Sequence, residues 1–426
     1  MKTKRIFFGM VLVASTAIAD EQPQPQRHIV RAGDTCASIA QKYYGDSRLV
    51  DVIHRANADL AEKPPPHDLK EGTVLLIPPK PVGGKFPDAQ LTTVRNRVEV
   101  LTPASKEGKP NDPLFRGNRV STQEESGADV TFRDETQVKL GERTLVIILG
   151  DAKGAAQKVA PGEVQTTLVT GNLRTFMPSS RHSTPATVNT DAARVKTYSG
   201  ETQVSADQVK TTRLAVYQGS STIDGHGKLR EVAKGYGSKA ENGKQPTVPR
   251  LLPPPTVFSV APPLVVHDQG APKIVAEYDL PNRPDITVSE WHVQIAHDGI
   301  FRSVVADTKA PGAVKKLEIQ VPGAGRYYVR VSAIDQDGFE GAFGRTARTL
   351  VVKETVEELD GGRRKISVFP SDAFCVRVGN VKLARVEGPI EAGKTEAVQV
   401  RCAPHDTDPT TLLSLGSLGA PPPARH

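Results

Sequence analysis

The chain has 426 residues, of which 24% are charged and 38% hydrophobic, and its formal net charge is +7. This length is too great for one hydrophobic core, and together with 34 prolines and 36 glycines it predicts several β-rich modules joined by stiff linkers. The positive charge is far below the dense basic surface that nucleic-acid binding requires, so we expect no nucleic-acid partner.

The N-terminus has the pattern of a secretory signal peptide. Basic residues at positions 2, 4 and 5 precede the apolar run Ile6–Thr16, and Ala17-Ile18-Ala19 supplies a small-x-small cleavage site. We therefore predict a signal peptide over residues 1–19 and a mature chain exported to the periplasm or the cell surface. The apolar run is too short to span a membrane stably, so we do not expect an integral membrane protein.

Residues 28–79 predict a compact unit with the order strand, helix, helix, strand. The extended run that starts at His28 ends in a Gly33-Asp34-Thr35 turn, and apolar residues then recur at helical spacing until Gly45. A second helix with the same spacing ends at Asn57, and after a Pro-rich loop Thr73–Pro78 predicts a buried strand.

This unit resembles the LysM domain. Four family signatures occur in order: Gly33-Asp34-Thr35-Cys36, Ile39-Ala40, Ile53-His54-Arg55-Ala56-Asn57 and Leu75-Leu76-Ile77-Pro78. Cys36 stands where the family has Leu, and the loop Ala58–Glu71 is longer than usual. The resemblance implies a small α+β (βααβ) fold that binds N-acetylglucosamine polymers such as peptidoglycan or chitin.

The resemblance also implies a shallow sugar-binding groove between the loop after the first strand and the loop before the second. We expect unpaired backbone N–H groups of the turn to donate to an N-acetyl carbonyl, and Gly33 to let the sugar approach closely. The alternative is that Asp34 or Thr35 merely caps a helix and Asn57 merely ends one. The expected carbohydrate-binding residues are Gly33, Asp34, Thr35, Cys36, Ala56, Asn57, Ala58 and Leu69.

We predict a linker over residues 80–95 and a β domain over residues 96–245 that resembles the FecR domain. The resemblance rests on the strand Gly117–Thr122, followed by Val130–Asp134, with Glu135 in place of the family's turn glycine. FecR domains relay signals, but they do so with a helix bundle and a membrane span for which this sequence has no pattern. We therefore expect a module that contacts another envelope protein, with a sensory adaptor as the alternative.

The remaining chain predicts further β modules. A Pro-rich linker over 246–255 precedes regularly spaced strands over 256–353, where Gly325–Asp335 resembles the penultimate strand of a fibronectin type III-like sandwich. A small β unit over 355–405 and a disordered tail over 406–426 follow. Of the three cysteines, Cys375 and Cys402 are the natural disulfide pair, which makes Cys36 a buried apolar residue.

No catalytic residue, metal site or cofactor is expected. The sequence Ser371–Arg377 is similar to the active-site motif of L,D-transpeptidases, but Phe374 replaces the glycine before Cys375. His292 and His297 are five positions apart on a strand and therefore face opposite sides. The sequence thus predicts a non-enzymatic scaffold or adaptor that binds peptidoglycan, with a wall-modifying enzyme using Cys375 as a further alternative.

Overall fold

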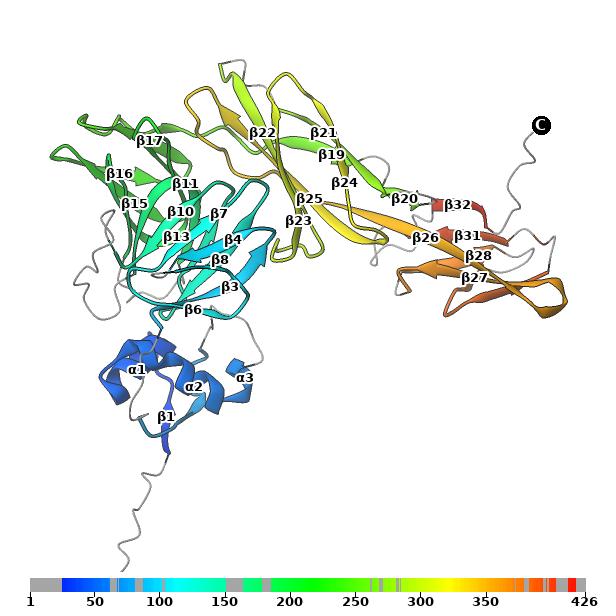
Figure 1. Cartoon of the computed structure of the whole chain (residues 1–426), viewed down its shortest axis with the longest axis horizontal. Coiled ribbons are helices and arrows are strands. Elements are labelled where there is room, and N and C mark those ends of the chain that lie inside the picture. Colours follow the sequence, from blue (N-terminus) through cyan, green and yellow to red (C-terminus); the bar gives the residue numbers. More distant parts are fainter. Residues whose placement is uncertain are drawn as a thin grey trace, which may run out of the picture.

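The protein is mainly β, with several sheets that follow one small α+β module (Figure 1), which confirms the predicted fold class. The computed structural model describes residues 25–61, 67, 69–80, 87–101, 104–150, 164–177, 185–260, 263–267, 271–280, 283, 285–371, 373–378, 383–393, 396, 398–403 and 413–418. The predicted signal peptide lies outside these residues. Within them, no helix has the length and apolarity needed to cross a membrane.

The N-terminal module (residues 25–80) has the predicted βααβ order. Its elements are β1 (Gln26–Ile29), α1 (Cys36–Tyr44), the 3-10 helix η1 (Ser47–Leu49), α2 (Val50–Ala56), α3 (Ala58–Ala61) and β2 (Val74–Ile77). Gly45 ends α1 in a left-handed conformation with φ 68°, as expected for a helix C-cap. The short helix α3 occupies the start of the segment predicted as a loop. The strands pair antiparallel, and Ile39, Ile53 and Ile77 are fully buried between them and the helices.

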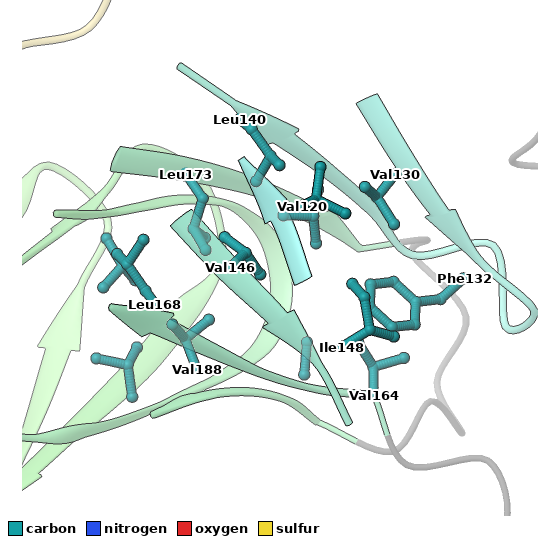
Figure 2. Packing of buried hydrophobic residues seen from close by; sticks show 14 of the residues in the cluster. Val120, Val130, Phe132, Leu140, Val146, Ile148, Val164, Leu168, Leu173 and Val188 are labelled. Atoms are coloured by element: carbon teal, nitrogen blue, oxygen red, sulfur yellow. The ribbon is translucent and has the colours of Figure 1, made fainter. Parts of the chain in front are cut away.

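The middle module (residues 87–251) consists of two sheets that share the long, bent strands β11 and β13. Its strands are β3 (Ala89–Arg95), β4 (Val98–Leu101), β5 (Ser105–Glu107), β6 (Asp112–Leu114), β7 (Arg119–Thr122), β8 (Gly127–Phe132), β9 (Gln137–Leu140), β10 (Leu145–Ile148), β11 (Gln165–Met177), β12 (Ala186–Asn189), β13 (Arg194–Ala206), β14 (Thr211–Val216), β15 (Ser220–Gly225), β16 (Lys228–Ala233), β17 (Tyr236–Glu241) and β18 (Arg250–Leu251). Alternate residues of these strands, such as Val120, Val146 and Leu173, meet in one apolar core (Figure 2).

The sandwich (residues 257–353) has two sheets. One has the strand order β19-β21-β24, and the other has the order β23-β22-β25-β26, with β20 beside β26. These strands are β19 (Val257–Val260), β20 (Leu264–His267), β21 (Lys273–Asp279), β22 (Val288–Ala296), β23 (Val304–Pro311), β24 (Lys316–Gln320), β25 (Gly325–Asp335) and β26 (Ala347–Leu359). Trp291 on β22 is fully buried in the core, together with Val293 and Ile295, as the alternating pattern predicts. This arrangement fits the fibronectin type III-like prediction.

The C-terminal unit (residues 363–418) contains β27 (Arg363–Phe369), β28 (Cys375–Val378), β29 (Leu383–Arg385), β30 (Ile390–Ala392), β31 (Val398–Cys402) and β32 (Leu413–Leu418), after the 3-10 turn η2 (Asp360–Gly362). Strand β26 runs out of the sandwich and pairs with β27, so one strand joins the two units. The orientation of the C-terminal unit is therefore linked directly to the sandwich.

Four segments differ from the predicted boundaries. Strand β3 lies within the expected linker 80–95, β18 within the linker 246–255, and β32 within the tail 406–426. Strand β26 crosses the expected boundary between 353 and 355. In each case pairing with a strand elsewhere in the chain supplies backbone hydrogen bonds that local composition does not reveal.

Candidate functional site

The carboxylate of Asp34 is held inside the N-terminal module. It accepts hydrogen bonds from His28 Nε2 and from the Arg31 backbone N–H, both at 2.8 Å. Partial burial raises the pKa of Asp34, but these two donors outweigh it and bring the pKa below its usual value. The Asp34 side chain therefore fixes the turn against β1.

Thr35 is the N-cap of α1. Its Oγ1 accepts the Ser38 backbone N–H at 3.0 Å, and its own N–H donates to Ser38 Oγ at 2.9 Å, a reciprocal capping box. The Asp34 N–H donates to Arg31 O at 3.0 Å. The expectation of unpaired N–H groups is thus wrong for Asp34 and Thr35, because the turn and the cap use both. The N–H of Gly33, which is exposed with φ 86°, forms no hydrogen bond to another described residue.

Asn57 holds the end of α2 against β2. Its amide nitrogen donates to Ile53 O at 2.7 Å and to Leu76 O at 2.9 Å, and its oxygen accepts the Leu76 N–H at 2.8 Å. Ala58 beside it is exposed and Ala56 is half-buried. The Asn57 side chain is therefore fully used by the fold, which leaves backbone and apolar groups for a ligand.

The two loops expected to form the groove lie side by side. Because β1 and β2 are antiparallel, the loop after β1 meets the loop before β2, where the Val30 N–H donates to Thr73 O at 2.8 Å and the Gly72 N–H to Val30 O at 2.9 Å. The Gly33 turn is on one of these loops and half-buried Leu69 on the other. The structure thus brings together the loops, but the sugar contact itself stays a prediction.

A second set of polar residues lies where the N-terminal module meets the middle module. Cys36 at the start of α1, His54 on α2, His67 in the following loop and Glu135 in the turn between β8 and β9 place one ligand atom each within 4.8 Å of one another. Cys36 is 1% exposed and is the free cysteine of the chain. Sequence analysis missed this cluster, because three of its members come from separate segments of one module and the fourth from another.

Glu135 lies at the centre of this cluster. Its Oε1 is 2.8 Å from His67 Nδ1 and 3.5 Å from His54 Nε2, and its Oε2 accepts the His67 backbone N–H. Burial raises the pKa of Glu135, but the two histidines outweigh it and lower the pKa to about 2. Burial also raises the pKa of the Cys36 thiol, and the neighbouring Glu135 carboxylate adds to the effect. The His54 Nε2 atom is buried and forms no hydrogen bond within the described residues.

A buried charge network joins the middle module to the sandwich. Glu340 accepts hydrogen bonds from His292 Nδ1 at 2.7 Å and lies 3.1 Å from Arg174 of the middle module. His292 Nε2 is 2.6 Å from Asp307, whose other oxygen is 2.8 Å from Arg95 of the middle module. Burial lowers the pKa of His292, but Glu340 and Asp307 outweigh it and raise the pKa to about 9. His292 is therefore cationic at neutral pH.

The same interface continues at the Asp335–Gly338 turn of the sandwich. Asp335 pairs with Arg250, and Asp337 pairs with Arg250 at 3.0 Å and with Lys239 at 3.0 Å. The acidic turn of the sandwich thus meets basic side chains of the middle module.

A cleft of about 1020 Å³ lies between these two modules. Its charged lining has both signs and includes Arg95, Lys139 and Arg174 from the middle module and Asp307 and Glu340 from the sandwich. Two pairs of these charges are already joined across the interface, Arg95 with Asp307 and Arg174 with Glu340. The cleft therefore resembles a polar surface between two modules more than an apolar pocket for a small molecule.

The predicted disulfide is confirmed. Cys375 on β28 and Cys402 on β31 are directly opposite in the antiparallel pair and are covalently joined, with Cα atoms 4.0 Å apart. In this state the Cys375 sulfur is not a free thiol, so it cannot act as the nucleophile of a transpeptidase-like reaction.

Comparison with family models supports two of the resemblances. Residues 28–78 match the LysM domain, and residues 118–220 match the FecR protein family. LysM and FecR-like domains are binding and signalling modules, and similarity to LysM indicates binding to glycans that contain N-acetylglucosamine. A search of curated proteins gives no significant match.

Solved structures show only partial likeness. A candidate anti-sigma factor from Parabacteroides distasonis ATCC 8503 is 17% identical, with a TM-score of 0.27 over 31% of this chain and 59% of that chain. The chicken CNTN1 FN1-FN3 domains are 14% identical, with a TM-score of 0.19 over 53% of this chain and 94% of that one. The extracellular domain of a candidate one-component system from B. thetaiotaomicron is 8% identical, with a TM-score of 0.18 over 54% of this chain and 36% of that chain. The chain thus spans about three fifths of the anti-sigma factor's length.

Proposed function

We propose that the protein is an exported component of the cell envelope that binds peptidoglycan through its LysM module and presents its β modules as a scaffold or adaptor. The observation that carries this proposal is the LysM match over residues 28–78, in a module whose strand, turn and helix order fits that family. The signal-peptide pattern of residues 1–19 supports export.

The groove would act mainly through backbone and apolar groups. The side chains of Asp34, Thr35 and Asn57 are used internally, whereas Gly33 is exposed and offers an N–H without a partner among the described residues. Leu69 and Ala58 would supply apolar contact for the acetyl methyl group. Such a site binds one sugar weakly, so repeated sites on an insoluble polymer would matter for retention.

The test is sedimentation with purified insoluble peptidoglycan. The full mature chain should sediment with the polymer, and a chain that lacks residues 20–80 should remain in the supernatant. Gly33→Val should weaken binding in the otherwise intact protein, because a branched side chain blocks the approach of the sugar and strains a backbone with φ 86°. Equal sedimentation of the truncated and complete chains would contradict the assignment.

A sensory adaptor is the second candidate, favoured by the FecR match over residues 118–220. Here the middle module would receive a signal from an envelope protein while the N-terminal module holds the wall. Cross-linking in intact cells, followed by identification of the cross-linked partner, distinguishes the two roles. A reproducible membrane-receptor partner that is lost on deletion of the middle module supports the adaptor; cross-links to wall polymer alone support the scaffold.

A further inference from the structure

We propose that Cys36, His54, His67 and Glu135 form a binding site for a zinc-type divalent metal ion, and that this ion joins the N-terminal module to the middle module. These residues come from both modules, and their ligand atoms all lie within 4.8 Å of one another. The proposal does not depend on peptidoglycan binding.

The ligand set fits zinc. One thiolate, two imidazoles and one carboxylate are four protein ligands of the types that Zn²⁺ prefers, and a full set of four is typical of structural sites. The sulfur and the imidazoles disfavour Ca²⁺ and Mg²⁺, which prefer oxygen. The charges of a thiolate and a carboxylate balance those of a divalent ion, which makes a neutral and therefore tolerable buried centre.

The geometry needs only a small adjustment. Bond lengths of about 2.0 to 2.3 Å in a tetrahedral zinc site place ligand atoms roughly 3.3 to 3.8 Å apart. The carboxylate of Glu135 is already 2.8 Å from His67 Nδ1 and 3.5 Å from His54 Nε2. The His67 N–H holds the second carboxylate oxygen and so orients the first toward the histidines, as outer-shell hydrogen bonds do in metal sites.

The sequence departs from both family patterns at this place. Cys36 replaces the Leu of the LysM signature, His67 lies in the lengthened loop, and Glu135 replaces the turn glycine of the FecR signature. Glu135 adopts φ 68°, a conformation that favours glycine, in a turn held by Asp134, which accepts the Thr136 N–H at 3.0 Å. A strained glutamate and a replaced core leucine are each unfavourable alone, but both become useful if they are ligands of one ion.

The metal would fix how the two modules sit against each other. Three ligands belong to the N-terminal module and one to the middle module, so binding requires the docked arrangement and stabilises it by mass action. The site also adjoins the expected sugar groove. Cys36, which is itself among the expected carbohydrate-binding residues, directly follows Thr35, and His67 is two residues before Leu69. The orientation of the wall-binding loops would therefore depend on the ion.

The experiment uses the full mature chain, after removal of any polyhistidine tag and treatment with a chelator. We expect one equivalent of zinc to bind, a rise of a few degrees in Tm, and slower hydrogen exchange in the turn around Glu135. Cobalt(II) should give visible bands of tetrahedral geometry and a near-ultraviolet thiolate-to-metal charge-transfer band, which identifies Cys36 as a ligand.

Two variants and a matched control complete the test. Cys36→Ser should abolish the thiolate band, and Glu135→Gly should abolish the zinc-dependent rise in Tm. Glycine suits φ 68° but also removes the acceptor of the His67 N–H, so each variant is judged by the difference in Tm with and without zinc and not by its metal-free stability. His226→Asn removes an exposed histidine from a distant turn with φ 45° and should bind zinc normally. Absence of stoichiometric zinc binding by the wild type, or unchanged zinc and cobalt behaviour in both variants, would overturn the proposal.

Discussion

The largely buried His292, whose side chain is 13% exposed, makes the stability of the sandwich depend on pH in a predictable direction. Its pKa rises to about 9 from an ordinary value of 6.5, because the attraction of Glu340 and Asp307 outweighs the cost of burial. A group with a raised folded-state pKa stabilises the fold fully below its unfolded pKa, and this contribution is lost as the pH rises through the folded pKa. We therefore expect the sandwich to become less stable between neutral and alkaline pH.

The expected loss can be estimated from the shift. A difference of one pKa unit corresponds to about 1.4 kcal/mol, so the rise from 6.5 to about 9 sets a loss of about 3 kcal/mol between about pH 6 and about pH 9. The partners Glu340 and Asp307 stay ionised over this range, since the cationic network lowers the pKa of both carboxyls. Burial lowers the pKa of nearby Arg330 to about 10, so measurements should stop at about pH 9 to avoid titrating it.

The single tryptophan provides the assay. Trp291 precedes His292 on β22 and is fully buried in the sandwich, so its fluorescence during urea unfolding reports this module selectively. The free energy of unfolding should fall with pH in the wild type and remain nearly level in His292→Gln. It should fall normally in His297→Gln, which removes an exposed histidine directly after the same strand. A level profile in the wild type would refute the reasoning.

Three further substitutions test separate parts of the fold. Thr35→Ala removes the cap of α1 and should cost about 1 kcal/mol, seen as faster hydrogen exchange at the start of α1; unchanged exchange would contradict the capping role. Breaking the Cys375–Cys402 bridge by Cys375→Ser should destabilise the C-terminal unit by roughly 3 to 4 kcal/mol, so the variant should be cleaved faster by a protease; cleavage at the wild-type rate would contradict the prediction. Gly219→Ala places a Cβ 2.1 Å from the Ser199 carbonyl oxygen at φ 76°, so the middle module should lose more than about 2 kcal/mol in thermal unfolding, a loss that normal stability would disprove.

Local patterns predicted the N-terminal module well. Gly45 ends α1 and Asn57 ends α2 as expected, and Thr35 caps α1, which was the alternative to a sugar contact. Each of these effects depends on a backbone conformation or a hydrogen bond within a few residues. The disulfide was also predictable, since both cysteines lie in one short β segment. These features need no knowledge of how distant segments meet.

Boundaries and interfaces were harder to predict, for one physical reason. Strands β3 and β18 lie in segments whose proline and glycine content suggests a linker. Pairing of β3 with β6 and β8, and of β18 with β17, makes them part of a sheet. The ion pairs of His292 likewise require that β23 and the turn before Gly341 approach β22. The composition of a segment indicates how much conformational entropy is lost when that segment becomes ordered. The hydrogen bonds and ion pairs that compensate for this loss come from residues far away in the sequence.

A signal for the four-residue cluster was nevertheless present in the sequence. Cys36 and Glu135 were visible as departures from two separate family patterns, and each was individually unfavourable: a smaller residue in a core position, and a glutamate where a turn requires positive φ. A fold tolerates such residues when they gain an interaction elsewhere, and the structure shows that these two meet in one cluster together with His54 and His67. Departures from different families that converge on one point are therefore stronger evidence for a shared role than either departure alone.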